Sequence, residues 1–149
     1  MSRDEFATID SPGASVTLPW KINSRGEIAG VYIDTSGTAH GYLLSGGEFT
    51  SIDFPGAADT DAWGINSRGE IVGGYRFAHC DPFSIIEHHG FELRDGQFTS
   101  IDFPGALFTR PFAISPRGDI VGEYRGLDGR NHGFLISTGV DEKRGDEKE

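Results

Sequence analysis

Short stretches of apolar and β-branched residues recur along the chain, and residues typical of turns separate them. The stretch 49–54 has the alternation and the β-branched content of a strand. Three further strands are predicted at residues 62–66, 70–75 and 90–93. No segment has the periodicity of a helix of convincing length. The pattern therefore predicts an all-β protein.

The sequences between these strands predict tight turns. Pro55-Gly56 suits the two central positions of a type II turn, because proline presets φ and glycine accepts a positive φ. Ser67-Arg68-Gly69 predicts a hairpin loop with the glycine in the left-handed conformation, and Asp95-Gly96 is a further hairpin signal. Short connections of this kind join strands that are neighbours in a sheet.

The strand pattern occurs three times. Residues 49–57 recur unchanged as residues 98–106, and a looser copy opens the chain at residues 6–14. The chain therefore consists of tandem units of 43 to 49 residues, which is the signature of a repeat architecture.

Two further motifs mark each unit. Ile-Asn-Ser-Arg-Gly-Glu-Ile at 22–28 recurs identically at 65–71, and again at 114–120 with substitutions that include Pro116 and Asp119. Each unit then contains Gly-x-Tyr and ends with His-Gly-aromatic, whose histidines are His40, His89 and His132.

These motifs resemble the HAF repeat, a motif of predicted extracellular bacterial proteins built around Ile-Asn-x-x-Gly-x-Ile-Val-Gly and a following His-(Ala/Gly)-Phe. The likeness covers nearly the whole chain up to Val140. It implies a β-propeller-like fold and an extracellular location, and it carries no established activity. The chain differs from the family in having no signal sequence and only three units.

A four-stranded unit of about 45 residues has the size of a propeller blade. Propellers typically close with four to eight blades, so three blades leave two raw edges. The chain begins with what reads as a fourth strand and ends with a third strand. We therefore expect a homodimer in which two chains form a six-bladed ring and each N-terminal strand completes the partner's last blade. The alternative is a β-trefoil, which also uses three four-stranded units and closes within one chain.

The expected organisation is one repeat domain followed by a tail. The domain covers residues 1–140, and the strongly charged residues 141–149 are predicted to be disordered. Its parts are the opening fourth strand at 6–10 and units at about 12–54, 55–103 and 104–139.

Composition restricts the partners. The net charge of −10 disfavours binding to nucleic acid and to anionic membrane surfaces, because both require a basic footprint. No stretch is apolar for 18 residues, so no membrane-spanning helix is predicted. The single cysteine, Cys80, cannot form a disulfide within the chain.

Candidate binding residues lie after the Pro-Gly turn of the second unit and in an insert of six residues that this unit carries before His89. In a propeller these segments share one face, where aromatic rings beside carboxylates and hydroxyls suit a sugar or another small polar ligand. The candidate ligand-binding residues are Asp59, Thr60, Asp61, Trp63, His79, Asp81, His88 and His89.

The recurring residues favour structural roles. Trp20, Trp63 and Phe112 occur once per unit and read as core or blade-seam residues. Asp53 and its counterparts each lie two residues before a proline, where the carboxylate can accept backbone N–H groups of the turn. The recurring histidines are expected to make one hydrogen bond each at the start of a strand.

No familiar catalytic or phosphate-binding motif occurs, no zinc-ligand spacing is present, and no cofactor is expected. The sequence therefore favours a non-catalytic binding or assembly module that recognises a small polar ligand or a protein partner. The alternatives are a hydrolase or lyase that acts through Asp59, Asp61 and His89, and a structural fragment of a longer repeat array.

Overall fold

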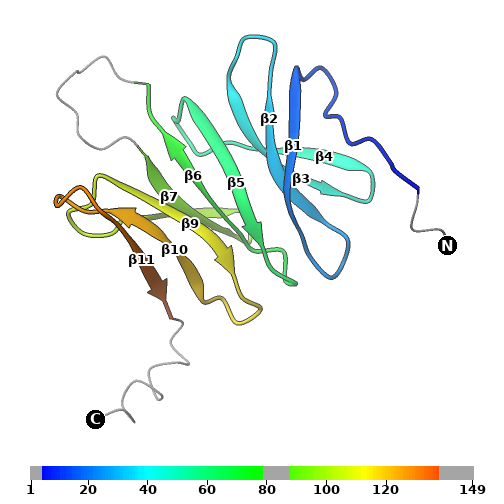
Figure 1. Cartoon of the computed structure of the whole chain (residues 1–149). Coiled ribbons are helices and arrows are strands. Elements are labelled where there is room, and N and C mark those ends of the chain that lie inside the picture. Colours follow the sequence, from blue (N-terminus) through cyan, green and yellow to red (C-terminus); the bar gives the residue numbers. More distant parts are fainter. Residues whose placement is uncertain (1–4, 79–87, 138–149) are drawn as a thin grey trace.

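The computed structural model describes residues 5–78 and 88–137 (Figure 1). These residues form β-strands and turns and contain no helix, so none of them belongs to a helix that could span a membrane. The strands are β1 (Val16–Ile22), β2 (Ile28–Ile33), β3 (Ala39–Ser45), β4 (Glu48–Ile52), β5 (Asp59–Ile65), β6 (Ile71–Arg76), β7 (His89–Arg94), β8 (Gln97–Ile101), β9 (Phe108–Ile114), β10 (Ile120–Arg125) and β11 (Asn131–Ile136).

The strands form three separate antiparallel sheets, and each sheet lies within one predicted unit. Their orders are β1-β2-β3-β4, β5-β6-β7-β8 and β9-β10-β11, so every strand pairs with its neighbours in the chain. The sheets follow one another in a row, and β5 contacts both β1 and β9 (Figure 1). The described residues close no barrel.

The predicted turns are confirmed. Gly56 has a φ of +78°, and the N–H of Ala57 donates to the carbonyl of Phe54 at 3.0 Å, as in a type II turn. Asp95 and Gly96 both have a positive φ, which is typical of a type I′ hairpin. The predicted strands also agree with the observed ones, with ends that differ by one to three residues.

A threonine in the first strand of each sheet secures the turn that leads into it. The hydroxyl oxygen of Thr60 accepts the N–H of Phe54 at 3.0 Å, and Thr109 accepts the N–H of Phe103 at 2.9 Å. Phe54 follows the last strand of the first sheet, yet its ring stacks on Tyr75 of the second sheet with centroids 3.7 Å apart. Each connection is therefore fastened to the sheet that it enters.

The asparagine of the recurring Ile-Asn motif has two structural roles. The Asn66 side-chain oxygen accepts the N–H groups of Arg68 and Glu70 and so shapes the hairpin loop between β5 and β6. Its amide donates to the carbonyl of Ser115 in the third sheet at 2.8 Å. Asn23 makes the same bonds and donates to the carbonyl of Asn66 at 3.0 Å. The motif thus joins successive sheets.

Aromatic and aliphatic side chains fill the space between the first and second sheets. Phe91 is completely buried and packs near Phe54, Tyr75 and Phe98. A second, smaller cluster around Val72, Ile114 and Ile120 joins the second sheet to the third. The two clusters thus hold the first sheet to the second and the second sheet to the third.

Tyr42 occupies in the first sheet the place that Phe91 has in the second. Its ring is fully buried, and its hydroxyl has no hydrogen-bond partner among the described residues. Burial also raises the pKa of this hydroxyl. The hydroxyl therefore costs stability, because a buried polar group without a partner loses its bonds to water.

Replacement of Tyr42 by phenylalanine is expected to raise the free energy of unfolding by about 1–3 kcal/mol, the usual penalty of such a group. Urea denaturation measures this change. Tyr75→Phe is the matched control, because the Tyr75 hydroxyl lies 2.7 Å from the Ser100 hydroxyl and its loss should destabilise. A Tyr42→Phe protein less stable than the wild type would contradict the expectation.

Candidate functional site

A pocket of about 240 Å³ opens between the loop after β2 and strands β5 and β6. Its polar walls come from Asp59, Asp61 and Arg76, and an aromatic wall comes from Trp63. The remaining lining residues are Gly37, Ala39, Thr60, Gly74, Tyr75 and His88.

The second unit departs from the repeat at one cross-strand pair that lines the pocket. In the first sheet Leu18 pairs with Val31, and in the third sheet Arg110 pairs with Glu123. In the second sheet the corresponding pair is Asp61 and Gly74. Because Gly74 has no side chain, the Trp63 ring packs on it beside the carboxylate of Asp61, and a Cβ on Gly74 would be 2.5 Å from that ring.

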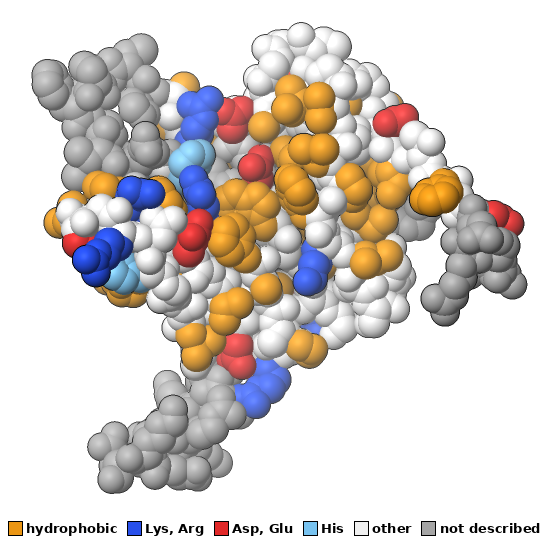
Figure 2. All heavy atoms as spheres, in the orientation of Figure 1, with side chains coloured by type: hydrophobic (Ala, Val, Ile, Leu, Met, Phe, Trp, Pro, Cys, Tyr) orange, Lys and Arg blue, Asp and Glu red, His pale blue; other side chains and the backbone are white. Residues whose placement is uncertain are grey.

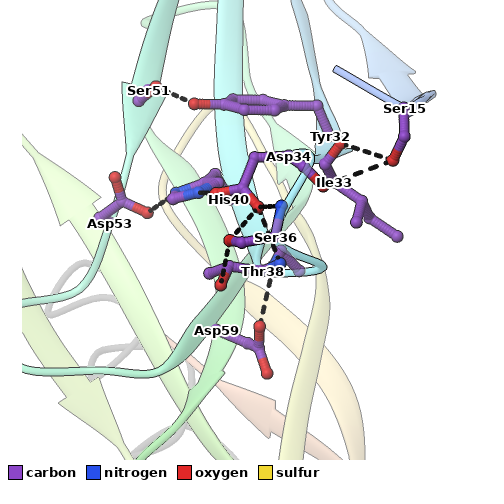
Figure 3. A network of polar contacts seen from close by, with 11 residues as sticks. Ser15, Tyr32, Ile33, Asp34, Ser36, Thr38, His40, Ser51, Asp53 and Asp59 are labelled. Atoms are coloured by element: carbon purple, nitrogen blue, oxygen red, sulfur yellow. Dashed lines mark hydrogen bonds and ion pairs between the residues drawn. The ribbon is translucent and has the colours of Figure 1, made fainter. Parts of the chain in front are cut away.

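Asp59 holds the rim of the pocket. Its carboxylate accepts the N–H of Ala39 at 2.8 Å, which ties the first sheet to the second (Figure 3). It also pairs with the guanidinium of Arg76 on the neighbouring strand. The charge of Asp59 is therefore compensated within the protein.

Asp61 has no cation paired with it among the described residues. Burial raises the pKa of its carboxyl, and the nearby charge of Asp59 raises it further, while a hydrogen bond from Trp63 acts in the opposite direction. A half-buried carboxyl of this kind gains from any group that donates a hydrogen bond to it.

The structure brings together five of the eight predicted binding residues, namely Asp59, Thr60, Asp61, Trp63 and His88. Thr60 is buried and serves the turn before β5, so its role is structural. His89 lies outside the pocket wall, where Nδ1 is 2.9 Å from Asp102 and the ring stacks on Tyr75. His79 and Asp81 lie outside the described residues.

The contribution of Gly74 to the pocket does not follow from the strand pattern, which predicts this residue only as part of a strand. The other units have Val31 and Glu123 at its position. A position-by-position comparison of the three units carries this signal, because it shows that only the second unit has a glycine there.

The recurring histidines bind carboxylates, and this corrects the role expected for the aspartates. Asp53 contacts the His40 ring nitrogen Nδ1 at 2.7 Å (Figure 3), whereas Thr60 binds the turn N–H expected to go to Asp53. Asp34 lies 2.8 Å from the other ring nitrogen of His40. The histidine therefore bridges two carboxylates, and its ring stacks on Tyr32.

These bonds shift the pKa values in opposite directions. Burial opposes the charge on His40, but the bonds to Asp34 and Asp53 outweigh it and raise the pKa of the imidazole. Hydrogen bonds from Ser36 and then His40 lower the pKa of the Asp34 carboxyl. The charged pair thus stabilises the fold above the ordinary aspartate pKa and below the ordinary histidine pKa.

His40→Gln should therefore destabilise the protein more at pH 5 than at pH 8. A histidine whose pKa is raised in the folded state stabilises the fold fully below the unfolded pKa of about 6.5. This stabilisation is lost as the pH rises through the folded pKa. The measurement is urea denaturation of both proteins at the two pH values. An equal loss at both would show that the charge on His40 does not contribute.

The recurring aromatic residues lie at a bulge in the first strand of each sheet. The strand register shifts at Trp20, Trp63 and Phe112. Trp63 packs on Phe112 with centroids 5.7 Å apart, which fits the predicted seam. Trp20 and Phe112 are about half exposed, so neither is a core residue, and Phe112 fits the seam alternative through its contact with Trp63.

Within residues 5–78 and 88–137, no cluster of three or more His, Cys, Asp or Glu side chains could hold a metal ion. No family model matches the chain, and neither a curated protein nor a solved structure is significantly similar to it. The geometry of the pocket is therefore the main guide to function.

Proposed function

We propose that the protein is a non-catalytic binding module, built as half of a six-bladed β-propeller, whose pocket at Asp61 and Trp63 takes a small neutral ligand rich in hydroxyl groups, such as a sugar. The observation that carries the proposal is the Asp61–Gly74 pair, because in the second unit a carboxylate lies beside a glycine on which the Trp63 ring packs, whereas the other two units have side chains on both strands.

The propeller accounts for the arrangement of the sheets. Each sheet is a meander of antiparallel strands, and the chain passes from the last strand of one sheet to the first strand of the next. The first strands β1, β5 and β9 are neighbours, as strands around a propeller axis are. A β-trefoil is less well supported, because it requires a barrel shared by the units. The likeness to HAF repeats agrees with this choice.

The chemistry of the pocket favours a hydroxyl-bearing ligand. Asp61 can accept a hydrogen bond from a hydroxyl, Arg76 can donate one, and the Trp63 ring offers an apolar surface. An anionic ligand would approach a chain of net charge −10 and an uncompensated carboxylate. These charges therefore disfavour an anionic ligand.

Catalysis by Asp59, Asp61 and His89 is less well supported. His89 lies outside the pocket and is hydrogen-bonded to Asp102, and Asp59 forms an ion pair with Arg76. A general acid–base pair needs both groups within reach of one substrate atom.

The test is titration of a Trp20→Phe protein with neutral mono- and disaccharides, in which the fluorescence change reports Trp63 alone. Asp61→Asn should weaken binding at least about tenfold, because an amide replaces the carboxylate acceptor. Gly74→Val should also abolish the response, since it restores the side chain that the first unit has and displaces Trp63. Arg110→Ala, at the corresponding position of the third sheet, is the control.

Asp61→Asn should at the same time raise the free energy of unfolding at pH 7. A carboxyl whose folded pKa is raised destabilises the fold where it is ionised, so removing its charge helps. Weaker binding with greater stability is the pattern of a residue kept for function. Unchanged titrations in Asp61→Asn, or no response to any neutral sugar, would refute the proposal.

A further inference from the structure

The residues that pack one sheet on the next have equivalents at the two ends of the row of sheets. Inside the row, each contact joins a glycine of one sheet to the first strand of the next. A Cβ on Gly41 of β3 would be 3.3 Å from that of Ala62 in the next sheet, and a Cβ on Gly90 of β7 would be 2.6 Å from the ring of Pro111. Each glycine thus lets the first strand of the following sheet approach closely. Ala62 and Pro111 are both fully buried in these contacts.

In the third sheet the equivalent glycine is Gly133, and no following sheet of the described chain packs against it. A Cβ on Gly133 of β11 would meet nothing closer than an oxygen of its own sheet at 3.8 Å. In the first sheet Pro19 of β1 corresponds to Ala62 and Pro111. It is exposed, because no glycine of a preceding sheet packs against it in the described chain. Gly133 and Pro19 are therefore the two halves of a contact that occurs twice inside the chain.

The apolar side chains around this contact are likewise buried inside the row of sheets and exposed at its two ends. Ala29 and Val72 are fully buried under the sheet that follows them, whereas their counterpart Val121 is 47% exposed. Ile65 and Ile114 are buried against the preceding sheet, and their counterpart Ile22 is 62% exposed. Leu135 pairs with Val121 across the strands and is also exposed. We call Val121, Gly133 and Leu135 the trailing face, and Pro19 and Ile22 the leading face.

Among the described residues the third sheet has three strands, whereas the other two sheets have four. In the first sheet β4 supplies Ser51 to the hydroxyl of Tyr32 at 2.6 Å and Asp53 to His40. In the second sheet β8 supplies Ser100 to Tyr75 and Asp102 to His89 in the same way. In the described part of the chain Tyr124 and His132 have no such strand beside them, and His132 contacts Asp128 instead.

The N-terminal segment carries the missing side chains. Phe6-Ala7-Thr8-Ile9-Asp10 has the spacing of Phe49-Thr50-Ser51-Ile52-Asp53, so Thr8 and Asp10 correspond to Ser51 and Asp53. Residues 5–10 form no strand in this chain, and Phe6 is 99% exposed. The segment lies beside β1, at the opposite end of the row from β11 (Figure 1).

We infer that a second copy of the chain closes the ring, with the leading face of each copy on the trailing face of the other and residues 6–10 of each paired with β11 of the other. This inference rests on the propeller arrangement in the proposed function. Asp10 would reach His132 and Thr8 would reach Tyr124 of the other copy. Two copies supply six sheets, which is within the usual range for a propeller.

The occupant is a second copy because the exposed residues repeat contacts that the chain already makes with itself. The two faces lie on opposite ends of one molecule, so the contact is heterologous, and a two-fold axis makes it occur twice and close. Apolar side chains gather on the side of the molecule where β1 and β5 lie (Figure 2). In β1, Ile22 of the leading face is 62% exposed.

The first test is the mass in solution of the full chain, measured by light scattering. The expected value is twice the chain mass of 16.1 kDa. Val121→Asp should raise the dissociation constant at least about a hundredfold, because the charge enters both contacts of the ring. Leu127→Asp, on an exposed loop, is the matched control and should leave the mass unchanged. A folded monomer would overturn the inference, and so would a longer filament.

The second test addresses the strand. In the observed register Leu43 faces Thr50, so Leu135 should face Ala7 of the other copy. Ala7→Cys with Leu135→Cys, in a Cys80→Ser background, should oxidise to a disulfide that joins two chains. Ala7→Cys with Leu127→Cys should not. A dimer without the first disulfide would overturn the strand pairing. The pocket lies within one chain, so sugar titration of the Val121→Asp monomer reports the proposed function separately.

Discussion

Gly73→Ala is expected to lower the free energy of unfolding by about 3 kcal/mol or more, the upper part of the range for overpacked sites. A Cβ at this position would lie 1.9 Å from the carbonyl oxygen of Asp61 and 2.9 Å from the ring of Phe91. The carbonyl belongs to the strand backbone at the bulge and cannot move without breaking the pairing of β5 with β6. A Cβ on Gly30 or on Gly122 would likewise lie 2.1 Å from the corresponding carbonyl oxygen.

Urea denaturation of Gly73→Ala measures this loss. Gly126→Ala is the control, because a Cβ there would meet the Asp128 carboxylate at 2.9 Å, and that exposed side chain can rotate away. The control should change stability by less than about 1 kcal/mol. If both variants were equally stable, the close approach at the bulge would not limit the fold.

The second large effect is expected for Asn66→Ala. The change removes two hydrogen bonds to the loop backbone, one to Glu70 and one to the carbonyl of Ser115 in the third sheet. Asn66 is only 3% exposed, so water replaces few of them. We expect a loss of about 3 kcal/mol, since each bond contributes about 1 kcal/mol and unpaired buried groups cost more.

Asn66→Ser separates the two roles of this residue. In the third unit Ser115 stands at the same position, and its hydroxyl accepts the N–H of Asp119 at 3.0 Å. A serine at 66 should therefore keep part of the loop and lose the bond to the next sheet, with about half the loss in stability. A loss in Asn66→Ser equal to that in Asn66→Ala would mean that the bond between sheets dominates.

The repeat made most of the fold predictable. Strands, turns and unit boundaries follow from local alternation and from glycines that need a positive φ, such as Gly56 and Gly69. The packing of one sheet on the next is a long-range property, so the buried and the exposed members of a set like Val72 and Val121 read alike in the sequence.

The candidate site was predicted in part for a related reason. Asp59, Asp61 and Trp63 were found because they follow a recognisable turn. Gly74 was missed because its contribution is the absence of a side chain, which only the contrast with Val31 and Glu123 makes visible. Asp53 was given the wrong partner because its sequence neighbours gave no indication that a histidine from the adjacent strand lies within 2.7 Å.

The threonine at the start of each sheet has a consequence for how the molecule comes apart. Because the connections after the first and second sheets are held by Thr60 and Thr109, unfolding of the second or third sheet also releases the connection that precedes it. Heating should then give one sharp transition in place of three steps, and amide protons of all three sheets should exchange at similar rates.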